Sequence, residues 1–501
     1  MNNGRKMSRT SFDPDRRRLL QGFAAVPFLG ILPGCGRNST APLTASDTVL
    51  IVGAGMAGLT AANALNNAGI RNIVIEARDR TGGRLFTKNV GGIPIDLGAS
   101  WIHDPTGNPM TAFADSAGVT YRPADPTNDA ATILYYDAIS GTSLSSDLIT
   151  AYGNYNLFVQ SEAQWLSMLS NQASYKDGVE LFLDNQPALR APDQRRRSEQ
   201  FIRFLFEAFD AGRWDISSLY YDVNSPINRY GGSEFGNFPD GGYTRLVHAM
   251  ASSSDIRLKH KVTLVQVRDG GVTVFAQDNS SGGVPVQFTG SHVIVTLPLG
   301  VLKAGSVAFD PPLPASRQRS IQKVGVGHFE KVAMSFATPF WQAGTPSHTH
   351  LYYVTKNSSY PTEYAFSLDY QTFIGQPALV AVATAGFAEY AAQLTPEQNL
   401  TRMMQILREV YGPATPDPTD YAVSRWAVDE FSMGSYSNLP VGSTPVDMDE
   451  LGTPIGQRLL FAGEATYKER YGYADGALSS GLREAQRLIS NSSAVVTPGP
   501  A

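Results

Sequence analysis

The chain has 501 residues, a formal net charge of −5 and 42% hydrophobic residues. This length exceeds one ordinary hydrophobic core and predicts two or three domains, while the apolar content excludes a disordered chain in favour of a globular α/β or α+β protein. So mild an acidic charge offers no basic surface to a nucleic acid, and we expect no partner of that class.

The N-terminal region has the pattern of an export leader. Arg16 to Arg18 precede an apolar stretch, Leu19 to Leu32, which is too short to cross a bilayer but suits a signal sequence. The arginines resemble a twin-arginine export signal, with an ordinary secretory signal as the alternative. Cys35, the only cysteine, follows residues that resemble a lipoprotein processing box, so it is either a lipidated anchor or an unmodified leader residue. We expect an exported bacterial protein, periplasmic or membrane-anchored, with a leader at 1–35 and a linker at 36–47.

Residues 48–76 carry the spacing of a dinucleotide-binding unit. Val49 to Val52 is a β-branched run that predicts a buried strand, and the Ala-rich and Leu-rich stretch Leu59 to Ala68 predicts a helix. Between them lie three glycines, which permit a tight turn, a close approach to a pyrophosphate and close packing of helix on strand: Gly53, Gly55 and Gly58. A second buried strand, Ile73 to Ile75, ends at Glu76, where a carboxylate would bind a ribose hydroxyl.

The next run, Glu-Ala-Arg-Asp-Arg-Thr-Gly-Gly-Arg at residues 76–84, resembles the signature of the flavin-containing amine oxidase family, which includes monoamine and polyamine oxidases. In that family the run wraps FAD. The resemblance implies that Glu76 binds the adenosine ribose, that Arg78 lies beside it, and that Gly83 and Arg84 lie near the pyrophosphate. It also implies a discontinuous glutathione-reductase-like (Rossmann-type) FAD-binding domain with an inserted substrate-binding domain.

The segment Ile93 to His103 has the alternation and the glycine of a strand that passes close to a flat group. In the family this segment lies against the flavin ring and forms one wall of the substrate cavity. His103 is either a structural hydrogen-bonding group or an active-site residue that binds or deprotonates a cationic amine. The cofactor contacts that the resemblance implies here are Gly98, Ala99, Ser100 and Trp101.

The inserted domain has no motif of its own between residues 111 and 224. Apolar residues at helical spacing in Leu157 to Leu169 and in Phe201 to Phe209 predict a mostly helical domain. Asp210 and Asp215 could meet a cation, but solvated loop acids are the preferred interpretation. We expect the FAD-binding domain at 48–110, 225–308 and 422–490, the substrate-binding domain at 111–224 and 309–421, and a flexible tail at 491–501.

Three further motifs resemble the family. Val262, at the start of an alternating strand, matches a position whose backbone clasps adenine in relatives, and residues 293–302 form a buried strand stopped by a proline. Lys331 begins a strand on the face opposite Val332. Relatives have one lysine here, bridged by water to the reactive flavin nitrogen, and a surface lysine is the alternative.

The C-terminal signature combines a Gly-Glu turn with a helix. A glycine turn that feeds a helix N-terminus presents amides to a pyrophosphate, and the resemblance implies cofactor contacts for Trp426, Gly463, Glu464 and Ala474. Tyr436 and Tyr473 match two tyrosines that stand on either side of the amine in monoamine oxidases, although each alone is usually a packing residue.

One departure from the family decides how the cofactor is held. Animal monoamine oxidases attach FAD covalently through the cysteine before the first of these tyrosines, where this chain has Ser435. Because no cysteine follows Cys35, we expect FAD to be bound non-covalently.

The resemblance implies a flavin amine oxidase of primary or secondary amines or polyamines. A hydride would leave the amine α-carbon, the resulting imine would hydrolyse to an aldehyde with release of ammonia or an amine, and oxygen would yield hydrogen peroxide. The sequence has no metal-ligand motif.

Other activities stay open. The arginine that holds a substrate carboxylate in amino-acid oxidases is missing after Ala99, which disfavours an L-amino-acid oxidase unless Arg203 or Arg213 takes its place. A flavin dehydrogenase or desaturase with another acceptor, and a flavoprotein whose FAD is only structural, are the remaining alternatives.

Overall fold

The protein is described by a computed structural model that covers residues 43–44, 47–123, 133–143, 146–161, 172–232, 236–342, 350–357 and 359–492. The expected leader with Cys35, most of the linker and tail, and the part of the expected helix beyond residue 161 lie outside these residues. Export and lipid anchoring therefore stay predictions. Within the described ranges, no helix combines the length and the apolar character that a bilayer crossing requires.

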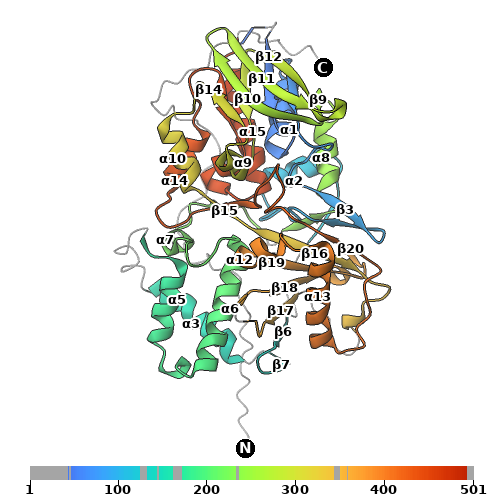
Figure 1. The fold of residues 1–501 in the computed structure, drawn as a ribbon, viewed down its shortest axis with the longest axis vertical. Coiled ribbons are helices and arrows are strands. Elements are labelled where there is room, and N and C mark those ends of the chain that lie inside the picture. Colours follow the sequence, from blue (N-terminus) through green and yellow to red (C-terminus); the bar gives the residue numbers. More distant parts are fainter. Residues whose placement is uncertain are drawn as a thin grey trace, which may run out of the picture.

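A five-stranded parallel sheet forms the centre of the upper half of the molecule (Figure 1). Distant segments supply its strands, and central β1 pairs β13 on one side and β2 on the other. Val49 to Val52 are buried, as predicted for this strand. In sheet order the strands are β22 (Leu459–Phe461), β13 (His292–Val295), β1 (Thr48–Val52), β2 (Arg71–Ile75) and β9 (Ile256–Arg257).

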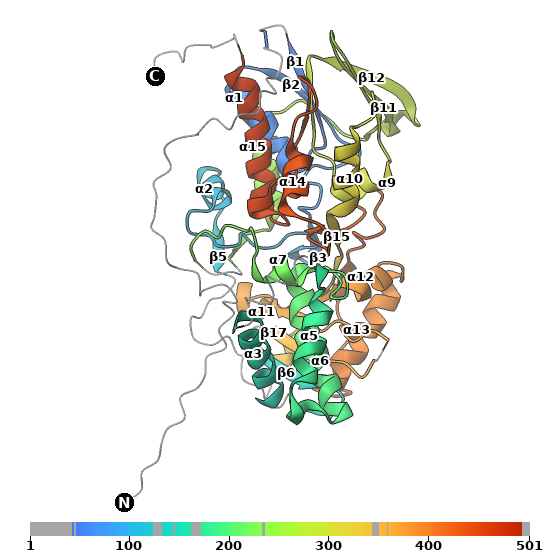
Figure 2. The same cartoon turned by 90° about the vertical axis from the view of Figure 1, so that its left-hand side faces the viewer.

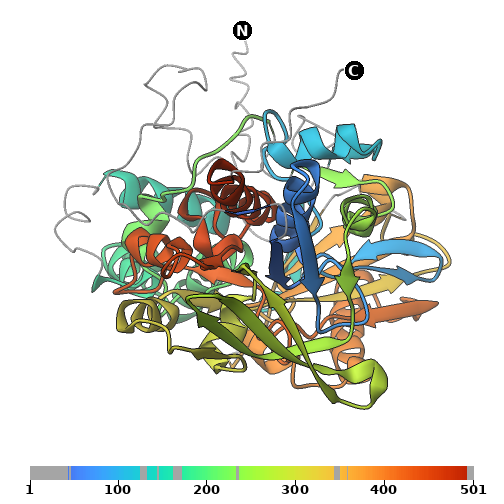
Figure 3. The same ribbon diagram turned by 90° about the horizontal axis from the view of Figure 1, so that it is seen from above.

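One face of this sheet is covered by helices. The long helix α15 (Ala474–Ser490) lies beside α1 (Met56–Asn67), and both pack into one apolar core with α8 (Tyr243–Ala251) and α2 (Pro109–Ser116) (Figure 3). Helix α1 starts three residues before the predicted position because the extended residue Gly55 serves as its N-cap.

The other face carries a four-stranded sheet, so the upper half has three layers. Valines of both sheets share one buried core, in which Val52 and Val295 meet Val265 and Val274. The strands in order are β12 (Val284–Gly290), β11 (Gly271–Asp278), β10 (His260–Arg268) and β14 (Ala308–Asp310).

The lower half is built on a seven-stranded mixed sheet. Its order is β20 (Asp420–Val423), β16 (Phe329–Ser335), β19 (Ala378–Thr384), β18 (Phe366–Asp369), β17 (His350–Val354), β6 (Ile133–Asp137) and β7 (Thr142–Ser143). The helices expected from residues 111–224 are present as α3 (Ser146–Ser161), α5 (Tyr175–Asp184), α6 (Pro192–Asp210) and α7 (Leu219–Val223), but the expectation left out this sheet. Strand β6 pairs with β17, which lies more than two hundred residues later in the chain. Local periodicity in the sequence does not predict such a pairing.

Helices cover both faces of this sheet (Figure 2). Phe201 and Phe204 of α6 pack on one face, and Met403 and Leu407 of α13 pack on the other. The helices of this half are α3 (Ser146–Ser161), α5 (Tyr175–Asp184), α6 (Pro192–Asp210), α7 (Leu219–Val223), α11 (Tyr370–Ile374), α12 (Ala385–Ala391) and α13 (Pro396–Tyr411).

Short paired strands lie between the halves, where Figure 1 shows β3 and β15. The pairs are β3 (Thr87–Val90) with β4 (Ile93–Asp96), β5 (Tyr121–Pro123) with β8 (Asn237–Pro239), and β15 (Gly325–Gly327) with β21 (Tyr436–Asn438). The upper half also carries α9 (Leu299–Ala304), α10 (Ala315–Lys323) and α14 (Pro445–Gly452). A covered parallel sheet joined to a second mixed sheet confirms the predicted α/β and α+β fold class.

Candidate active site

The glycine turn between β1 and α1 forms a cradle with one open position. A Cβ added at Gly53, whose φ is +106°, would lie 2.6 Å from Thr296 Oγ1, and one added at Gly58 would lie 2.0 Å from the Gly53 carbonyl oxygen. A Cβ added at Gly55 would meet no atom within 4 Å. Helix α1 has no side-chain cap at Gly55, so no capping side chain competes with a phosphate for its first-turn amides.

Glu76 lies directly beneath this turn. Its buried carboxylate accepts hydrogen bonds from the backbone N–H of Ala54 at 2.7 Å and of Arg78 at 2.8 Å. Burial raises its pKa, and these two amides oppose the shift. A carboxylate has further acceptor sites, so the position fits the predicted bond to a ribose hydroxyl. Val262 is buried at the start of the neighbouring strand β10.

Arg78 holds a segment that the sequence did not single out. Its guanidinium donates two hydrogen bonds to Asp429, at 2.9 and 2.5 Å, and one to Ser432 Oγ at 2.8 Å. The guanidinium also lies 5.3 Å from the Phe431 ring centroid. Arg78 therefore ties the β2 end to residues 429–432, and nothing local in the sequence predicts that pairing.

Arg84 and Glu464 meet at the centre of the site. Arg84 Nη1 donates to Glu464 Oε1 at 3.0 Å and to the Ser435 carbonyl at 2.7 Å. The other carboxylate oxygen of Glu464 accepts from Ser437 Oγ at 2.5 Å and from the Gly472 amide at 2.8 Å. Three other chain segments, those of Arg84, Ser437 and Gly472, thus donate to one buried carboxylate.

A cavity opens beside this pair. Arg84, Gly463 and Glu464 line it together with apolar side chains that include Leu297 and Phe461. A Cβ added at Gly463 would meet no atom within 4 Å, and one added at Gly83 would meet only Gly55 Cα, at 3.5 Å. A dinucleotide site needs glycines that let the backbone approach the pyrophosphate, backbone amides that can bind its oxygens, and a positive charge such as an arginine. Gly83, Arg84 and Gly463 therefore fit FAD, the cofactor that the sequence predicts.

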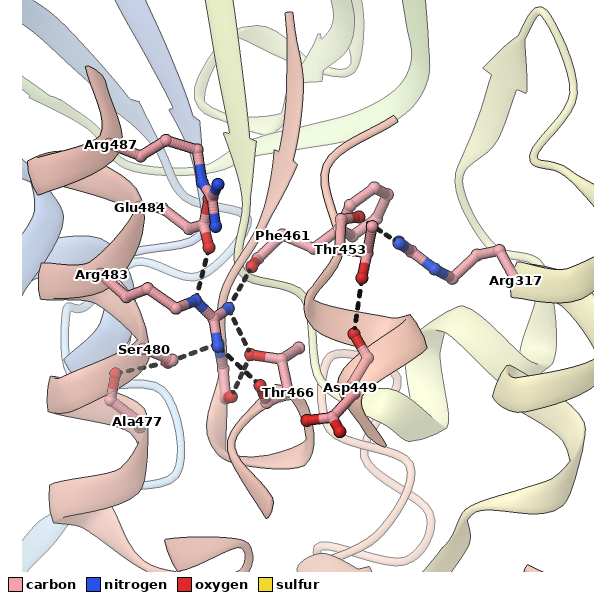
Figure 4. Close-up of polar contacts among 11 residues, drawn as sticks. Arg317, Asp449, Thr453, Phe461, Thr466, Ala477, Ser480, Arg483, Glu484 and Arg487 are labelled. Atoms are coloured by element: carbon pink, nitrogen blue, oxygen red, sulfur yellow. Dashed lines mark hydrogen bonds and ion pairs between the residues drawn. The ribbon is translucent and has the colours of Figure 1, made fainter. Parts of the chain in front are cut away.

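Helix α15 holds the Gly463–Thr466 turn in place (Figure 4). Arg483 donates to the Thr466 carbonyl at 2.8 Å and to the Phe461 carbonyl at 3.0 Å, while Ser480 Oγ accepts from the Gly463 amide at 2.9 Å. The sequence identified the turn and the helix but not this clamp. Ala474 is the first residue of α15, whose N-terminus has no side-chain cap.

Lys331 is a buried residue with 2% exposure, which excludes the surface-lysine alternative. Strand β16 begins at Phe329, two residues earlier than expected, and Lys331 lies on the face opposite Val332 as predicted. Its Nζ donates to the carbonyl oxygens of Gly98 at 2.7 Å and Asp96 at 3.0 Å, and to Ser100 Oγ at 2.5 Å. Burial lowers the pKa of Lys331, and the Asp96 carboxylate opposes the shift.

Residues 96–101, the segment predicted to form a wall of the substrate cavity, are held in place by contacts with several other segments. A Cβ added at Gly98 would lie 1.8 Å from the Arg84 carbonyl oxygen, so this position requires glycine, and the Ala99 amide donates to the same oxygen at 3.3 Å. Trp426 Nε1 donates to the Leu97 carbonyl at 2.9 Å. The Trp101 ring centroid lies 5.5 Å from Lys331 Nζ. Lys331 and Trp426 therefore support the segment that is predicted to face the flavin.

The two tyrosines come together at the other side of the site. A Cβ added at Gly472 would lie 3.4 Å from Tyr436 Cδ2, which places Tyr436 beside the residue that precedes Tyr473. The Tyr436 hydroxyl donates to the Phe209 carbonyl at 2.9 Å. His103 packs perpendicular to Tyr473, with ring centroids 4.9 Å apart.

The expected loop acids differ from each other. Asp210 is the last residue of α6 and is half-buried. Burial of the Tyr436 hydroxyl raises its pKa, and the negative charge of Asp210 raises it further. The interpretation of Asp210 as a solvated loop acid is therefore wrong. Asp215 pairs with Arg213 at 2.6 Å, and Arg203 pairs with buried Glu207 at 3.1 Å. No group of three or more metal-binding side chains occurs among the residues described.

Comparisons with known proteins identify the family of the chain. A family model described as flavin containing amine oxidoreductase matches residues 56–489. The chain is 31% identical over 453 residues to probable polyamine oxidase 4 of Arabidopsis thaliana, covering 88% of this chain and 86% of that protein. It is also 31% identical to lysine-specific histone demethylase 1 homolog 2 of the same plant, covering 88% of this chain but only 58% of that protein.

Among solved structures, wild-type putrescine oxidase bound to putrescine superposes with a TM-score of 0.70 at 23% identity, covering 89% of this chain and 99% of that one. That likeness supports the fold. The family match spans most of the chain, and the polyamine oxidase relative is matched over most of its length. The chain therefore belongs to the flavin-containing amine oxidoreductase family, which confirms the family and the FAD cofactor predicted from the sequence.

Proposed function

We propose that the protein oxidises primary or secondary amines, or polyamines, with oxygen as electron acceptor. When bound, FAD supplies a two-electron acceptor for the hydride of the amine α-carbon, and reoxidation by oxygen gives hydrogen peroxide. The observation that carries the proposal is that Lys331 and the tyrosine pair border the same segments. The Phe329 ring centroid lies 5.9 Å from Lys331 Nζ and 6.2 Å from that of Tyr436. On the 96–103 segment, the Trp101 ring centroid lies 5.5 Å from Lys331 Nζ, and that of His103 lies 4.9 Å from that of Tyr473. A protein with purely structural FAD has no need of a buried lysine there.

The chain itself binds and orients the reactants. Gly55, Glu76 and Arg84 would hold the dinucleotide, and Tyr436 and Tyr473 would orient the amine between their rings. Lys331 already has three acceptors for the three hydrogens of an ammonium group. To hold a water at the reactive flavin nitrogen, as the family resemblance implies, it would exchange one of these bonds.

A di- or polyamine is the favoured substrate class. Arg203 and Arg213, the candidates for binding an amino-acid carboxylate, are both engaged with carboxylates of their own. The half-buried Asp210 near Tyr436 offers a negative charge to a second, cationic nitrogen. The relatives named for polyamine and putrescine oxidation agree with this class.

An anaerobic titration with an amine panel tests the activity. Monoamines, putrescine, spermidine and several α-amino acids are added to the yellow holoenzyme, and bleaching of the flavin band is followed. We expect bleaching by di- and polyamines, with stoichiometric peroxide once air is admitted. Bleaching without peroxide formation would indicate a dehydrogenase, and bleaching only by α-amino acids an amino-acid oxidase. The proposal is rejected if no amine bleaches the protein.

Asp210→Asn tests the substrate class. Loss of this charge should raise KM for putrescine by about tenfold, as expected for a partly buried ion pair, and should leave KM for a monoamine of equal length unchanged. The matched control is Asp215→Asn, which removes a carboxylate that is already paired with Arg213. Equal effects of Asp210→Asn on both amines would contradict the assignment.

A further inference from the structure

A buried cluster of charges lies directly behind the tyrosine pair. Arg470, Asp104 and Asp475 are each at most 3% exposed. Arg470 Nε and Nη2 donate to the two oxygens of Asp475 at 2.6 and 3.1 Å, and Nη1 donates to Asp104 at 2.7 Å. Arg229 approaches the other oxygen of Asp104 at 3.5 Å. The two positive and two negative charges balance.

The cluster contacts the Tyr473 side of the predicted amine site. The Arg470 guanidinium lies 4.2 Å from the Tyr473 ring centroid, and this ring also meets His103. Asp104 directly follows His103, and Asp475 lies in the first turn of α15, whose N-cap is Tyr473 itself. One guanidinium therefore connects the two chain segments that carry Tyr473 and His103.

The backbone at Asp104 adopts a left-handed conformation. Its φ is +46°, in the left-handed region where a non-glycine residue carries strain. Glycine would adopt this conformation without cost. Aspartate is one of the few other residues that adopt it readily, and here its side chain also accepts a hydrogen bond from Arg470.

Stability alone is a weak explanation for the cluster. Burying an ion pair costs desolvation that its attraction often fails to repay, and an apolar replacement of similar volume is often equally stable. What the charged cluster adds is geometry, because a forked guanidinium fixes the angles between its partners.

We propose that Arg470, with Asp104 and Asp475, is a positioning residue for the amine-binding aromatic site: it fixes the Tyr473 ring against His103. This inference rests on the proposed function of the Tyr436–Tyr473 pair.

A double-mutant cycle of Arg470→Met and Tyr473→Leu tests the inference. Both variants and their combination are assayed for kcat/KM and for the limiting rate of anaerobic flavin reduction by the best amine of the panel. Arg470→Met should lower kcat/KM by about tenfold, within the range of coupling between residues in contact. In the Tyr473→Leu background the same change should have little further effect. Losses that multiply would overturn the proposal.

Arg402→Met is the matched control. Arg402 also pairs with a buried carboxylate, Glu363, and lies 5.2 Å from a tyrosine ring, that of Tyr390, but on α13 of the lower half. It should lower the melting temperature without changing kcat/KM. If Arg402→Met reduces kcat/KM as much as Arg470→Met, general destabilisation explains both and the proposal fails.

Two further variants and a crystal structure complete the test. Asp475→Asn keeps the shape of the cluster if Arg470→Met does not fold, and Arg470→Lys should restore activity only in part, because it lacks the fork. In crystals of Arg470→Met, or of Arg470→Lys if that variant does not fold, the Tyr473 ring should leave its position against His103, whereas it should stay there in Asp475→Asn. An unmoved ring in the Arg470 variant would reject the inference even if no amine reduces the wild type, so failure of the proposed activity stays distinguishable.

Discussion

Lys331 illustrates how a single residue can shape the site before any ligand binds. A buried ammonium is costly unless its hydrogens are accepted. Here two main-chain carbonyls and the Ser100 hydroxyl accept them, all within the 96–100 segment. The lysine therefore sets the position of the wall that is predicted to face the flavin, in addition to any direct role.

We expect Lys331→Met to slow flavin reduction or reoxidation by about a hundredfold, the lower end of what a positioned proton-transfer group contributes. FAD should stay bound, because Lys331 lies apart from Gly55 and Glu76 in the cradle. Stopped-flow absorbance separates the two half-reactions. Lys303→Met is the control: Lys303 is also partly buried, with its pKa lowered to about 8 by desolvation, but its Nζ donates to the Gln322 carbonyl and not to the 96–101 segment. Unchanged rates for Lys331→Met would reject its assigned role.

The neighbouring residue Glu330 lies in the same strand as Lys331, and the sequence did not identify it because it belongs to no motif. Its buried carboxylate accepts from Ser424 Oγ at 2.6 Å and from the Ala427 amide at 2.8 Å. It thereby holds the segment that carries Trp426. Burial raises its pKa from 4.5 to about 7.

This pKa predicts how stability depends on pH. Between pH 4.5 and 7 folded Glu330 keeps a proton that the unfolded chain has lost. Stability should therefore fall as pH rises through this window, by about 3 kcal/mol at roughly 1.4 kcal/mol per pKa unit. Glu330→Gln, which stays neutral, should remove this contribution. Urea unfolding of both proteins at pH 5 and pH 7.5 measures the difference, and an identical pH slope in the variant would contradict the assignment.

At the scale of elements, the glycines of the β1–α1 turn serve two different requirements: close packing of the fold and space for a bound cofactor. Gly58 has no room for a Cβ because the Gly53 carbonyl is 2.0 Å from its ideal position. Gly55 has room and an ordinary extended conformation, with φ at −78°. One glycine is thus required by the fold and the other only by what binds to it.

Substitution with alanine should distinguish these requirements. Gly55→Ala should leave the melting temperature of the apoprotein unchanged and weaken FAD binding at least about tenfold, because the methyl group enters the space for the pyrophosphate. Gly58→Ala should destabilise the apoprotein itself by about 1–3 kcal/mol through overpacking. Calorimetry of the apoproteins and fluorescence titration with FAD give both quantities. A destabilised Gly55→Ala apoprotein with normal FAD affinity would reverse the assignment.

At the scale of the whole molecule, local patterns predicted local structure. The strand–turn–helix unit at β1, α1 and β2 was predicted to within three residues at each boundary, since its signals lie within thirty positions. Lys331 was placed on the correct face of its strand because alternation is also local.

Interactions between distant segments could not be predicted in this way. The pairing of β6 with β17, the bond of Arg78 to Asp429 and that of Arg470 to Asp104 each join segments more than two hundred residues apart. Asp210 was misassigned for the same reason, because its neighbour Tyr436 is supplied by a remote strand. Without relatives to compare, one sequence holds no signal for such pairs.

Whether FAD can be attached through a cysteine depends on the cysteine content of the whole chain. The family resemblance matches Ser435 to the attachment cysteine of animal monoamine oxidases, and the Ser435 hydroxyl exchanges hydrogen bonds with the Phe329 backbone at 2.8 and 3.0 Å. We expect acid or heat denaturation to release intact FAD, one per chain, into the supernatant. Because binding to the folded state alone stabilises it, FAD at a hundred times its Kd should add about 2.7 kcal/mol to the free energy of unfolding. Absorbance of the supernatant and melting curves with and without FAD check both effects. Flavin that stays with the precipitated chain would show a covalent bond elsewhere, since Cys35 is the only cysteine.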